Sequence, residues 1–338
     1  MLQQPSKKLV VVTGAAGYIG GMTCIQLKNK GYEVIGIDRR YNSHLDSFYD
    51  EFIQSDFAEY DALSLYKKVY PVAIIHCAGT SLVGPSFTDP YDYFNNNVSK
   101  TNTVLNFIVK NIPKTKFIFS SSASVYGNIL KDCTEDSPTN PVSPYGESKL
   151  MVEKLLKWYN ESANLNYTSY RYFNAAGADV NGRHGQEPGA THIIARLYDA
   201  GLNDKTFTLY GTDYDTNDGT CIRDYIHVTD IADAHIIAID KSIQGIYNLG
   251  SFDGYSNYDI LNKVQTILDK KIVTTISNRR KGDPSRLIAD STKFRYMANW
   301  VPQCSIDEII KDSHTWYTSE TYSGLSASSR FTNSAAYA

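Results

Sequence analysis

The sequence has few cysteines, and their spacing matches neither a disulfide framework nor a zinc site. The five cysteines are scattered, odd in number and nowhere arranged as Cys-x-x-Cys. They are Cys24, Cys77, Cys133, Cys221 and Cys304. We therefore expect reduced thiols and no bound metal.

Long apolar runs and an excess of one charge are also absent. No apolar stretch approaches the ~18 residues that a membrane-spanning helix needs. Residues 1–8 are polar and lack the apolar core of a secretory signal. The formal net charge of −3 offers no basic surplus for nucleic acid or an anionic membrane. The sequence thus favours a cytoplasmic globular protein without nucleic-acid or membrane partners.

Strands and helices alternate over the first half of the chain. Continuous β-branched runs predict buried strands, and longer periodic segments predict helices. The expected strands are 9–13, 33–38, 72–77, 116–121 and 166–173, and the expected helices are 18–30, 96–111 and 145–163. This alternation predicts an α/β fold of the Rossmann type, with a doubly wound parallel sheet.

The pattern loosens after residue 174, where glycine-rich loops and short elements follow. A chain of 338 residues exceeds the ~250–300 at which single cores stop growing, so we expect two domains. A helix at 231–241 and a strand at 246–249 indicate a return to the first domain. We predict a first domain of 1–175 plus about 224–250, a smaller α/β lobe of 176–223 and 251–317, and a disordered tail of 318–338.

A glycine-rich loop lies between the first expected strand and the first helix. Gly14, Gly17 and Gly20 are spaced to allow a tight turn and close approach of the backbone to a pyrophosphate, with the helix amides at Tyr18 and Ile19 directed at the anion. Asp38 ends the second strand, where a carboxylate binds both ribose hydroxyls of an adenosine.

Two arginines follow Asp38 and bear on the choice of cofactor. An arginine can accept the 2′-phosphate of NADP, and Arg39 and Arg40 are both present. The carboxylate of Asp38 would repel that phosphate, so the sequence favours NAD.

Tyr145 and Lys149 stand one helical turn apart on the same face of an expected helix. A phenol beside an ammonium can act as a base, although it needs a pKa roughly three units below the usual ~10. Ser122 ends an upstream strand at the carboxyl edge of the sheet, where ligands bind. The three residues form a candidate catalytic group for a substrate hydroxyl.

These motifs resemble the extended short-chain dehydrogenase/reductases and, within them, the UDP-glucose/UDP-galactose 4-epimerase family. The resemblance extends in order from about residue 9 to residue 316. It rests on the glycine loop, Asp38, Cys77–Gly79, Asn96–Val98, Ser120–Gly127, Tyr145-x-x-x-Lys149, Arg171–Ala178, Thr191–Ile193, Asp218–Val228, Tyr247–Gly250 and Arg279–Asp283.

The resemblance implies an isomerase of galactose and carbohydrate metabolism that retains NAD. Tyr145 would take the proton of the sugar 4-hydroxyl, Ser122 would bond that hydroxyl, and Lys149 would hold the nicotinamide ribose. The 4-keto sugar would then turn, and hydride would return to its other face. Further cofactor contacts implied by the family are Asp56, Phe57, Cys77, Ala78, Gly79, Asn97 and Phe173.

The resemblance also implies a UDP-sugar site. Cationic side chains would bind the diphosphate, an aromatic ring would contact uracil, and a carboxylate would bind ribose. The residues expected there, besides Ser122 and Tyr145, are Asn174, Thr191, His192, Ile193, Tyr210, Arg223, Arg280, Asp283 and Leu287.

The chain departs from the family pattern at several places. The stretch from Asp38 to Asp56 is shorter than in most relatives, and Ser81 stands where many carry a lysine. Leu287 replaces a bulky tyrosine of some members, which leaves room for N-acetylated UDP-hexosamines.

Other functions remain open. A UDP-GlcNAc, UDP-glucuronate or UDP-xylose 4-epimerase would keep the same trio, whereas a dehydratase or decarboxylase would need an acid where Ala123 and Ser124 stand. A sensor of NAD or UDP-sugar would not need the trio, and a plain alcohol dehydrogenase would not need the UDP motifs.

A homodimer is expected through the helices near 96–111 and 145–163, as in relatives. These helices carry more apolar residues than one face each can cover. The residues concerned are Val98, Leu105, Ile108, Leu155, Leu156 and Trp158.

Overall fold

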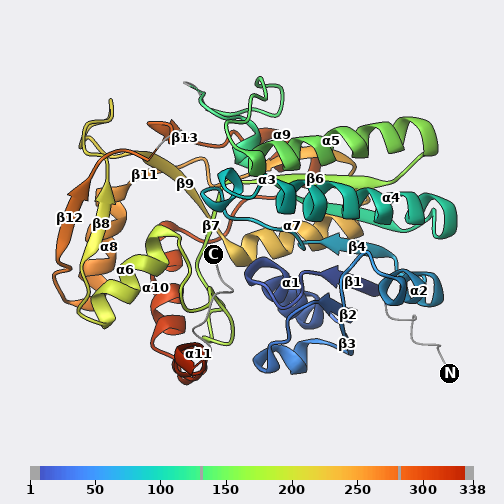
Figure 1. Ribbon diagram of the computed structural model, residues 1–338, viewed down its shortest axis with the longest axis horizontal. Coiled ribbons are helices and arrows are strands. Elements are labelled where there is room, and N and C mark those ends of the chain that lie inside the picture. The colour runs from blue at the N-terminus through green and yellow to red at the C-terminus, as the bar shows by residue number, and fades with distance from the viewer. Residues whose placement is uncertain (1–7, 130–131, 281–282, 332–338) are drawn as a thin grey trace. The chain divides into compact units, whose positions relative to one another are not determined.

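The structure, a computed structural model, describes residues 8–129, 132–280 and 283–331. The chain divides into two compact units: residues 1–125, 143–171 and 232–247 form the first, and residues 126–142, 172–231 and 248–338 form the second (Figure 1). The sequence-based boundaries had kept 126–142 in the first domain and placed the return at about 224–250. The second unit is nearly as long as the first, whereas the sequence predicted a distinctly smaller lobe.

The first unit is built on a seven-stranded sheet in the order β10-β6-β5-β4-β1-β2-β3. The strands are β1 (Leu9–Thr13), β2 (Glu33–Asp38), β3 (Glu51–Gln54), β4 (Ala73–His76), β5 (Lys116–Ser122), β6 (Tyr167–Tyr172) and β10 (Gly245–Leu249). β1 pairs in parallel with both β2 and β4, and β2 with β3 and β4 with β5 are also parallel. The order runs outward from β1 in both directions, which confirms the predicted doubly wound sheet.

Helices cover both faces of this sheet. Side chains of α2 (Tyr60–Val69), α4 (Lys100–Asn111) and α5 (Pro144–Ala163) share one apolar core with Phe117 and Phe119 of β5. On the other face, α1 (Tyr18–Asn29) meets α7 (Val228–Asp240), and a 3.0 Å hydrogen bond joins Thr23 Oγ1 to His235 Nδ1 (Figure 1).

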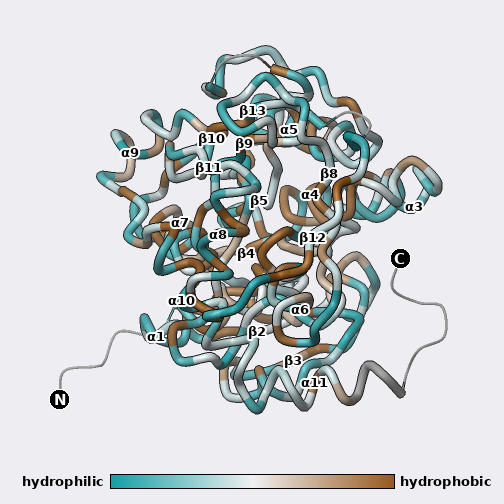
Figure 2. The backbone as a smooth tube through the Cα atoms, turned by 90° about the vertical axis from the view of Figure 1, so that its left-hand side faces the viewer, coloured by the Kyte–Doolittle hydropathy of each residue, from teal (hydrophilic) through white to brown (hydrophobic). Residues whose placement is uncertain are grey.

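The sequence explains where these elements begin and end. The residues of β4 are all buried, which suits its apolar run, and Figure 2 shows hydrophobic colour along this strand. Ser143 caps α5 by accepting a hydrogen bond from Gly146 N, and Pro144 occupies the first turn. Asn164 ends the helix in the left-handed conformation at φ 54°.

The predicted helix at 96–111 is wrong as a single α-helix. It is preceded by the short α3 (Pro90–Tyr93) and contains a π-helical segment, η3 (Phe94–Ser99), before α4 begins at Lys100. Asn96 and Asn97 lie in η3 and hydrogen-bond to Thr80, so side-chain contacts accompany the altered winding. Such π-segments frequently occur at functional sites. Sequence reasoning also missed β3 and α2.

The second unit has its own sheets and core. In one sheet β9 (Ile222–His227) lies between β11 (Gly254–Ser256) and β13 (Arg286–Leu287) and also pairs with β7 (Asn174–Ala176). β8 (Phe207–Tyr210) pairs with β12 (Thr274–Ser277). The helices of this unit are α6 (Ile193–Leu202), α8 (Asn257–Leu268), α9 (Thr292–Ala298), α10 (Ile306–Tyr317) and α11 (Glu320–Phe331).

Helix α11 corrects the prediction that residues 318–338 are a disordered tail. The ring of Tyr322 packs edge-on against Trp316, 5.7 Å between centroids, and against Tyr317 at 4.9 Å. Tyr322 and Leu325 thereby join the core of the second unit. The low hydrophobicity of the segment hid this contact. Residues 332–338 lie outside the described part of the chain.

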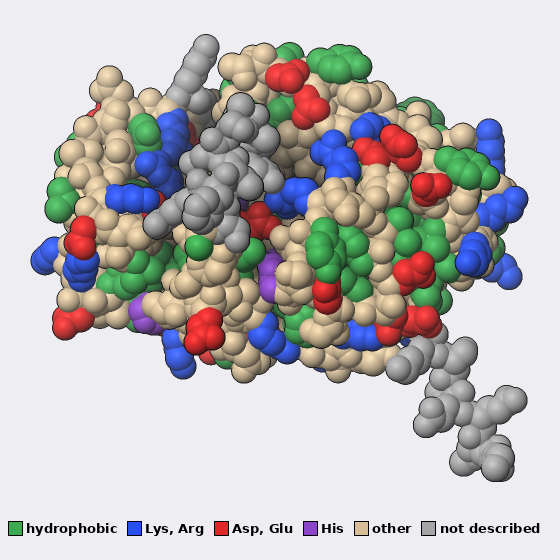
Figure 3. Space-filling view, turned by 60° about the horizontal axis from the view of Figure 1, so that its bottom comes forward, with side chains coloured by type: hydrophobic (Ala, Val, Ile, Leu, Met, Phe, Trp, Pro, Cys, Tyr) green, Lys and Arg blue, Asp and Glu red, His purple; other side chains and the backbone are tan. Residues whose placement is uncertain are grey.

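Surface and membrane features agree with the composition. Figure 3 shows acidic and basic side chains interspersed over the displayed face, without a large area of one sign. Among the residues that the structure describes, no helix is long and apolar enough to cross a membrane.

Candidate active site

The glycine loop connects β1 to α1 through contacts between backbone atoms. Gly14 has φ +70°, and a Cβ there would lie 2.6 Å from the amide nitrogen of Ala78. A Cβ on Gly20 would lie 2.0 Å from the Gly14 carbonyl oxygen. Such distances exclude any side chain at either position, so the loop holds the start of α1 close to the end of β4.

The N-terminus of α1 is arranged for an anion. Gly17 is the N-cap and has no side chain with which to cap the helix, and Tyr18 and Ile19 begin the first turn. Amide groups at a helix N-terminus and the helix dipole both favour a phosphate. The loop and helix therefore have the geometry that a pyrophosphate requires.

Asp38 lies at the end of β2 beside this loop. Its carboxylate accepts hydrogen bonds from the amides of Ala16, at 3.1 Å, and Arg40, at 3.0 Å. Asn42 donates to the Ala16 carbonyl at 2.7 Å. Sequence reasoning missed Asn42, although a short polar side chain just after Asp38 was a usable signal.

Asp56 and Phe57 are engaged within the first unit. Asp56 Oδ2 accepts from Lys100 Nζ at 2.6 Å. The Phe57 ring is buried and stands edge-on to His76, 4.7 Å between centroids. The side chain of Phe57 thus belongs to the core, which leaves its backbone as the part that could meet an adenine.

The turn after β4 is tied to α5. Gly79 has φ +148°, and a Cβ there would lie 2.7 Å from Asn97 Oδ1 and 3.7 Å from Lys149 Nζ. Asn97 Oδ1 accepts from the Thr80 amide at 2.8 Å, and its Nδ2 donates to Ser148 Oγ at 2.9 Å. Cys77, Ala78 and Gly79 therefore lead the backbone past Lys149.

The structure brings Ser122, Tyr145 and Lys149 together. Lys149 Nζ lies 5.9 Å from the centroid of the Tyr145 ring and donates to the Ser120 carbonyl at 2.8 Å. The hydroxyl of Ser122 lies close enough to the phenol of Tyr145 to lower the pKa of that phenol. All three groups meet where β5 ends and α5 begins, which is the carboxyl edge of the sheet.

Burial opposes charge at both ionisable members of the trio. Burial raises the pKa of Tyr145, and the hydrogen bond with Ser122 only partly offsets it. Burial also lowers the pKa of Lys149, to about 8. The protein alone therefore keeps the phenol protonated, and a further positive charge nearby would be needed to make Tyr145 a base at neutral pH.

Strand β9 organises the predicted sugar-nucleotide residues of the second unit. Arg223 at its start pairs with Leu287 of β13, and Tyr225 pairs with Asn174 of β7. Arg223 is buried, bonds to the Asp283 carboxylate and donates to the Pro284 carbonyl at 2.8 Å. A buried guanidinium with one carboxylate partner has donors left for an anion.

Tyr210 lies between two arginines. The guanidinium of Arg280 is 4.3 Å from its ring centroid, and that of Arg196 is 5.9 Å away. Arg196 was missed from the sequence, although it follows Ile193 by one helical turn. Lys281 and Gly282 of the matched motif lie outside the described residues.

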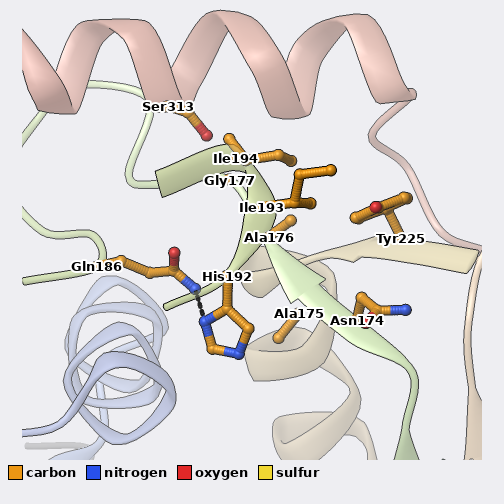
Figure 4. Close-up of a pocket in the computed structure, with 10 residues that line it drawn as sticks. All are labelled: Asn174, Ala175, Ala176, Gly177, Gln186, His192, Ile193, Ile194, Tyr225 and Ser313. Carbon is orange, nitrogen blue, oxygen red and sulfur yellow. Dashed lines mark hydrogen bonds between the residues drawn. The ribbon is translucent and has the colours of Figure 1, made fainter. Parts of the chain in front are cut away.

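A pocket in the second unit brings Asn174, His192 and Ile193 together (Figure 4). The amide of Gln186 bonds to His192 Nδ1 at 2.8 Å, the dashed line in Figure 4. The remaining lining residues are Ala175, Ala176, Gly177, Ile194, Tyr225 and Ser313. Gln186, Tyr225 and Ser313 were not expected. Thr191 is exposed beside the pocket residues, and Phe173 is buried with its ring 6.4 Å from that of Tyr126.

The fold and the site together define a class. A doubly wound sheet with a glycine loop after β1, a carboxylate after β2 and a Ser–Tyr–Lys trio at the carboxyl edge is the arrangement of a dinucleotide-dependent short-chain dehydrogenase/reductase.

Comparison with known proteins narrows this class. The profile of the NAD dependent epimerase/dehydratase family matches residues 10–250, and the chain belongs to this family. It is 37% identical to the UDP-glucose 4-epimerase of Lactobacillus helveticus over 322 residues, covering 92% of this chain and 97% of the relative.

Solved structures agree. The UDP-glucose 4-epimerase of Brucella ovis in complex with NAD has a TM-score of 0.85 and 34% identity, covering 91% of this chain and 98% of that one. The enzyme of Bifidobacterium longum in complex with NAD+ and UDP has a TM-score of 0.84 and 33% identity, covering 93% and 99%.

The lowered pKa of Lys149 yields a prediction. Burial also lowers the pKa of Lys116 to about 8, so NMR titration of protein with 13C-labelled lysine, with no nucleotide added, should show two ε-carbons with an apparent pKa near 8. Only the signal of Lys149 should be missing in Lys149→Met. Between about 8 and the ordinary 10.5, the unfolded chain binds more protons than the folded one, so the contribution of Lys149 to the unfolding free energy rises with pH. A pKa near 10.5 for that carbon would contradict the burial described here.

Proposed function

We propose that the protein is an NAD-dependent 4-epimerase of UDP-hexoses that interconverts UDP-galactose and UDP-glucose through a transient 4-keto sugar. The observation that carries this is the grouping of Ser122, Tyr145 and Lys149 at the carboxyl edge of the sheet, in a chain whose relatives are UDP-glucose 4-epimerases.

The residues of the first unit fit NAD. The uncapped start of α1 at Gly17, Tyr18 and Ile19 would bind the pyrophosphate, and Asp38 would bind the adenosine ribose. Lys149, beside Gly79, would bind the nicotinamide ribose. When bound, NAD+ supplies the hydride acceptor and a positive charge.

The chain itself moves the proton. The Tyr145 oxygen would take the proton of the sugar 4-hydroxyl, with Ser122 accepting and donating hydrogen bonds at the same oxygen. Burial raises the Tyr145 pKa, so the charge of Lys149 together with that of the oxidised cofactor is what would favour the phenolate. Inversion would come from return of the hydride to the other face of the turned keto sugar, and Tyr145 would give the proton back to the 4-oxygen.

The second unit supplies groups for UDP. Arg223 and Arg280 would bind the diphosphate, the Tyr210 ring would contact uracil, and Asp283 would bind ribose. Asn174, His192 and Ile193 line one pocket with polar and apolar groups, as a sugar nucleotide requires. Thr191 and Phe173 remain predictions from the family motifs.

Elimination chemistry is disfavoured by the segment after β5. A dehydratase would need a carboxylate there, but the short helix η4 (Ala123–Val125) offers only a hydroxyl, and Ser124 contacts Ser122 at 3.2 Å. The intact trio likewise disfavours a non-catalytic sensor.

The function is tested with purified protein, UDP-galactose, UDP-GalNAc and UDP-glucuronate, and no added cofactor. We expect UDP-glucose from UDP-galactose, because the NAD copurifies. Tyr145→Phe, which keeps the ring but removes the base, should lower kcat by at least ~100-fold, the usual contribution of a positioned acid–base group. Failure to form an epimer of any of the three substrates, with NAD supplied, would refute the proposal.

Leu287 gives a prediction about the sugar. It is only partly buried, and its backbone pairs with that of Arg223, which would bind the diphosphate to which the sugar is attached. We expect UDP-GalNAc and UDP-galactose to be turned over comparably, and Leu287→Tyr to reduce kcat/KM for UDP-GalNAc at least ~10-fold while sparing UDP-galactose, because the larger ring occupies space that the acetyl group needs. Equal effects on both substrates would contradict this assignment.

A homodimer is also proposed, through α4 and α5. Met151, Leu155 and Trp158 follow one face of α5, and 67% of the Trp158 surface is exposed. Three apolar side chains in such a stripe favour a protein partner over water. We infer that a second copy of the chain covers them.

Light scattering after size-exclusion chromatography tests the dimer. Trp158→Glu should shift the mass from dimer to monomer, because a carboxylate would be buried in the interface. Tyr296→Glu is the matched control, since Tyr296 of α9 is 89% exposed and belongs to the second unit. A monomeric unsubstituted protein would contradict the dimer.

A further inference from the structure

A buried ion pair stands next to the catalytic trio without touching the expected substrate. Glu153 lies on α5 one turn after Lys149, and Arg171 lies on β6. Arg171 Nη2 donates to Glu153 Oε2 at 2.7 Å, and Arg171 Nε donates to Glu153 Oε1 at 3.0 Å. Only 2% of Glu153 and 4% of Arg171 is exposed. Charges this deeply buried are costly, so a local function for them is worth seeking.

The pair is linked to the strand that carries Ser122. Ser121, itself 2% exposed, donates its hydroxyl hydrogen to Glu153 Oε1 at 2.6 Å. Ser121 lies between Ser120, whose carbonyl accepts from Lys149, and Ser122, which bonds to Tyr145. Three successive residues of β5 thus each approach one of three side chains, Tyr145, Lys149 and Glu153, that follow one another turn by turn along α5.

These connections set the register between α5 and β5. The apolar contacts in this core, such as Val152 and Leu156 against Phe117 and Phe119, are non-directional and would tolerate a small slide of the helix. The bond from Ser121 to Glu153 would not, because a slide leaves a buried carboxylate with fewer donors. Arg171, from the neighbouring strand, places its positive charge against both oxygens of Glu153 and so holds the carboxylate in this position.

We propose that Glu153 and Arg171 are positioning residues for the epimerase reaction, acting through Ser121 to fix Ser122 and the Ser120 carbonyl against Tyr145 and Lys149. This rests on the proposed function for its kinetic consequence. The geometric consequence, the placement of the Ser122 hydroxyl on the Tyr145 phenol, does not depend on any substrate.

Ser121→Ala isolates this role. It removes the bond to Glu153 but leaves the bidentate pair with Arg171 intact, so no charge is left unpaired. Ser169→Ala is the matched control: Ser169 is fully buried on β6, the strand next to β5, and within the described residues its hydroxyl has no hydrogen-bond partner. Both variants lose a hydroxyl oxygen from a buried strand position, but only Ser121→Ala loses a hydrogen bond to Glu153.

We expect Ser121→Ala to lower kcat by roughly tenfold with little change in KM, less than the ~100-fold loss that a 1 Å misplacement can cause. The apparent pKa of Tyr145, followed by NMR of 13C-labelled tyrosine and assigned with Tyr145→Phe, should rise, because the Ser122 hydrogen bond that lowers it is weakened. Ser169→Ala should change neither value. Unchanged kcat and Tyr145 pKa in Ser121→Ala would overturn the proposal.

A second variant separates positioning from stability. Glu153→Met combined with Arg171→Met removes both charges, and such replacements of buried pairs by apolar residues are often neutral or stabilising. We expect the melting temperature to be maintained while kcat falls and the Tyr145 pKa rises as in Ser121→Ala. A folded double variant with unaltered kcat and Tyr145 pKa would overturn the proposal. The titration needs no sugar nucleotide, so it decides the positioning role even if the unsubstituted protein proves inactive, a result that would refute only the proposed function.

Discussion

The docking of α5 on β5 is the constraint on which the first unit depends. Lys149 donates to the Ser120 carbonyl, and Ser148 accepts from Asn97 of η3. Asn97 also accepts from the Thr80 amide, so the helix is bonded directly to the strand and, through Asn97, to the turn after β4. That turn in turn packs on Gly14 of the glycine loop. The proposed proton-transfer site and the proposed pyrophosphate site are therefore parts of one continuous set of contacts within a single unit.

The second unit uses a strand in the same way. β9 places Arg223 and Tyr225 on successive positions of one side, while β13 and β7 bring Leu287 and Asn174 alongside. Asp224, between Arg223 and Tyr225 in β9, is buried. Its carboxylate accepts hydrogen bonds from the backbone amides of Ser251, Phe252 and Ala289. The Asp224 carboxylate thereby holds two loops against β9. This fixes the positions of Arg223 and Tyr225 on either side of it.

The sequence predicts an element well when the residues that determine it are close together in the chain. β1, β2 and α5 were predicted nearly to the residue, because buried β-branched runs and helix caps act over a few positions. Tyr145 and Lys149 were predicted from their spacing, and Ser122 from its place at the end of a strand. The π-helical turn at Asn96 and Asn97 was not, because it goes with bonds to Thr80, distant in sequence. Helix α11 was missed for a similar reason, since its packing partner, Trp316, lies on another helix. The ion pair between Arg171 and Glu153 was also not predicted, because nothing in the sequence around either residue indicates which residue it contacts.

The glycine loop has an evolutionary consequence. When a new side chain clashes with another side chain, a second substitution that shrinks the neighbour can restore the fit. The atoms that a Cβ on Gly14 or Gly20 would meet belong to the backbone of Cys77, Ala78, Gly14 and Ala15. No replacement elsewhere can shorten a peptide bond, so these positions have no compensating partner. Descendants of this chain can alter cofactor preference at Asp38 or Arg39, but they cannot drift away from glycine at the loop without rebuilding the turn itself.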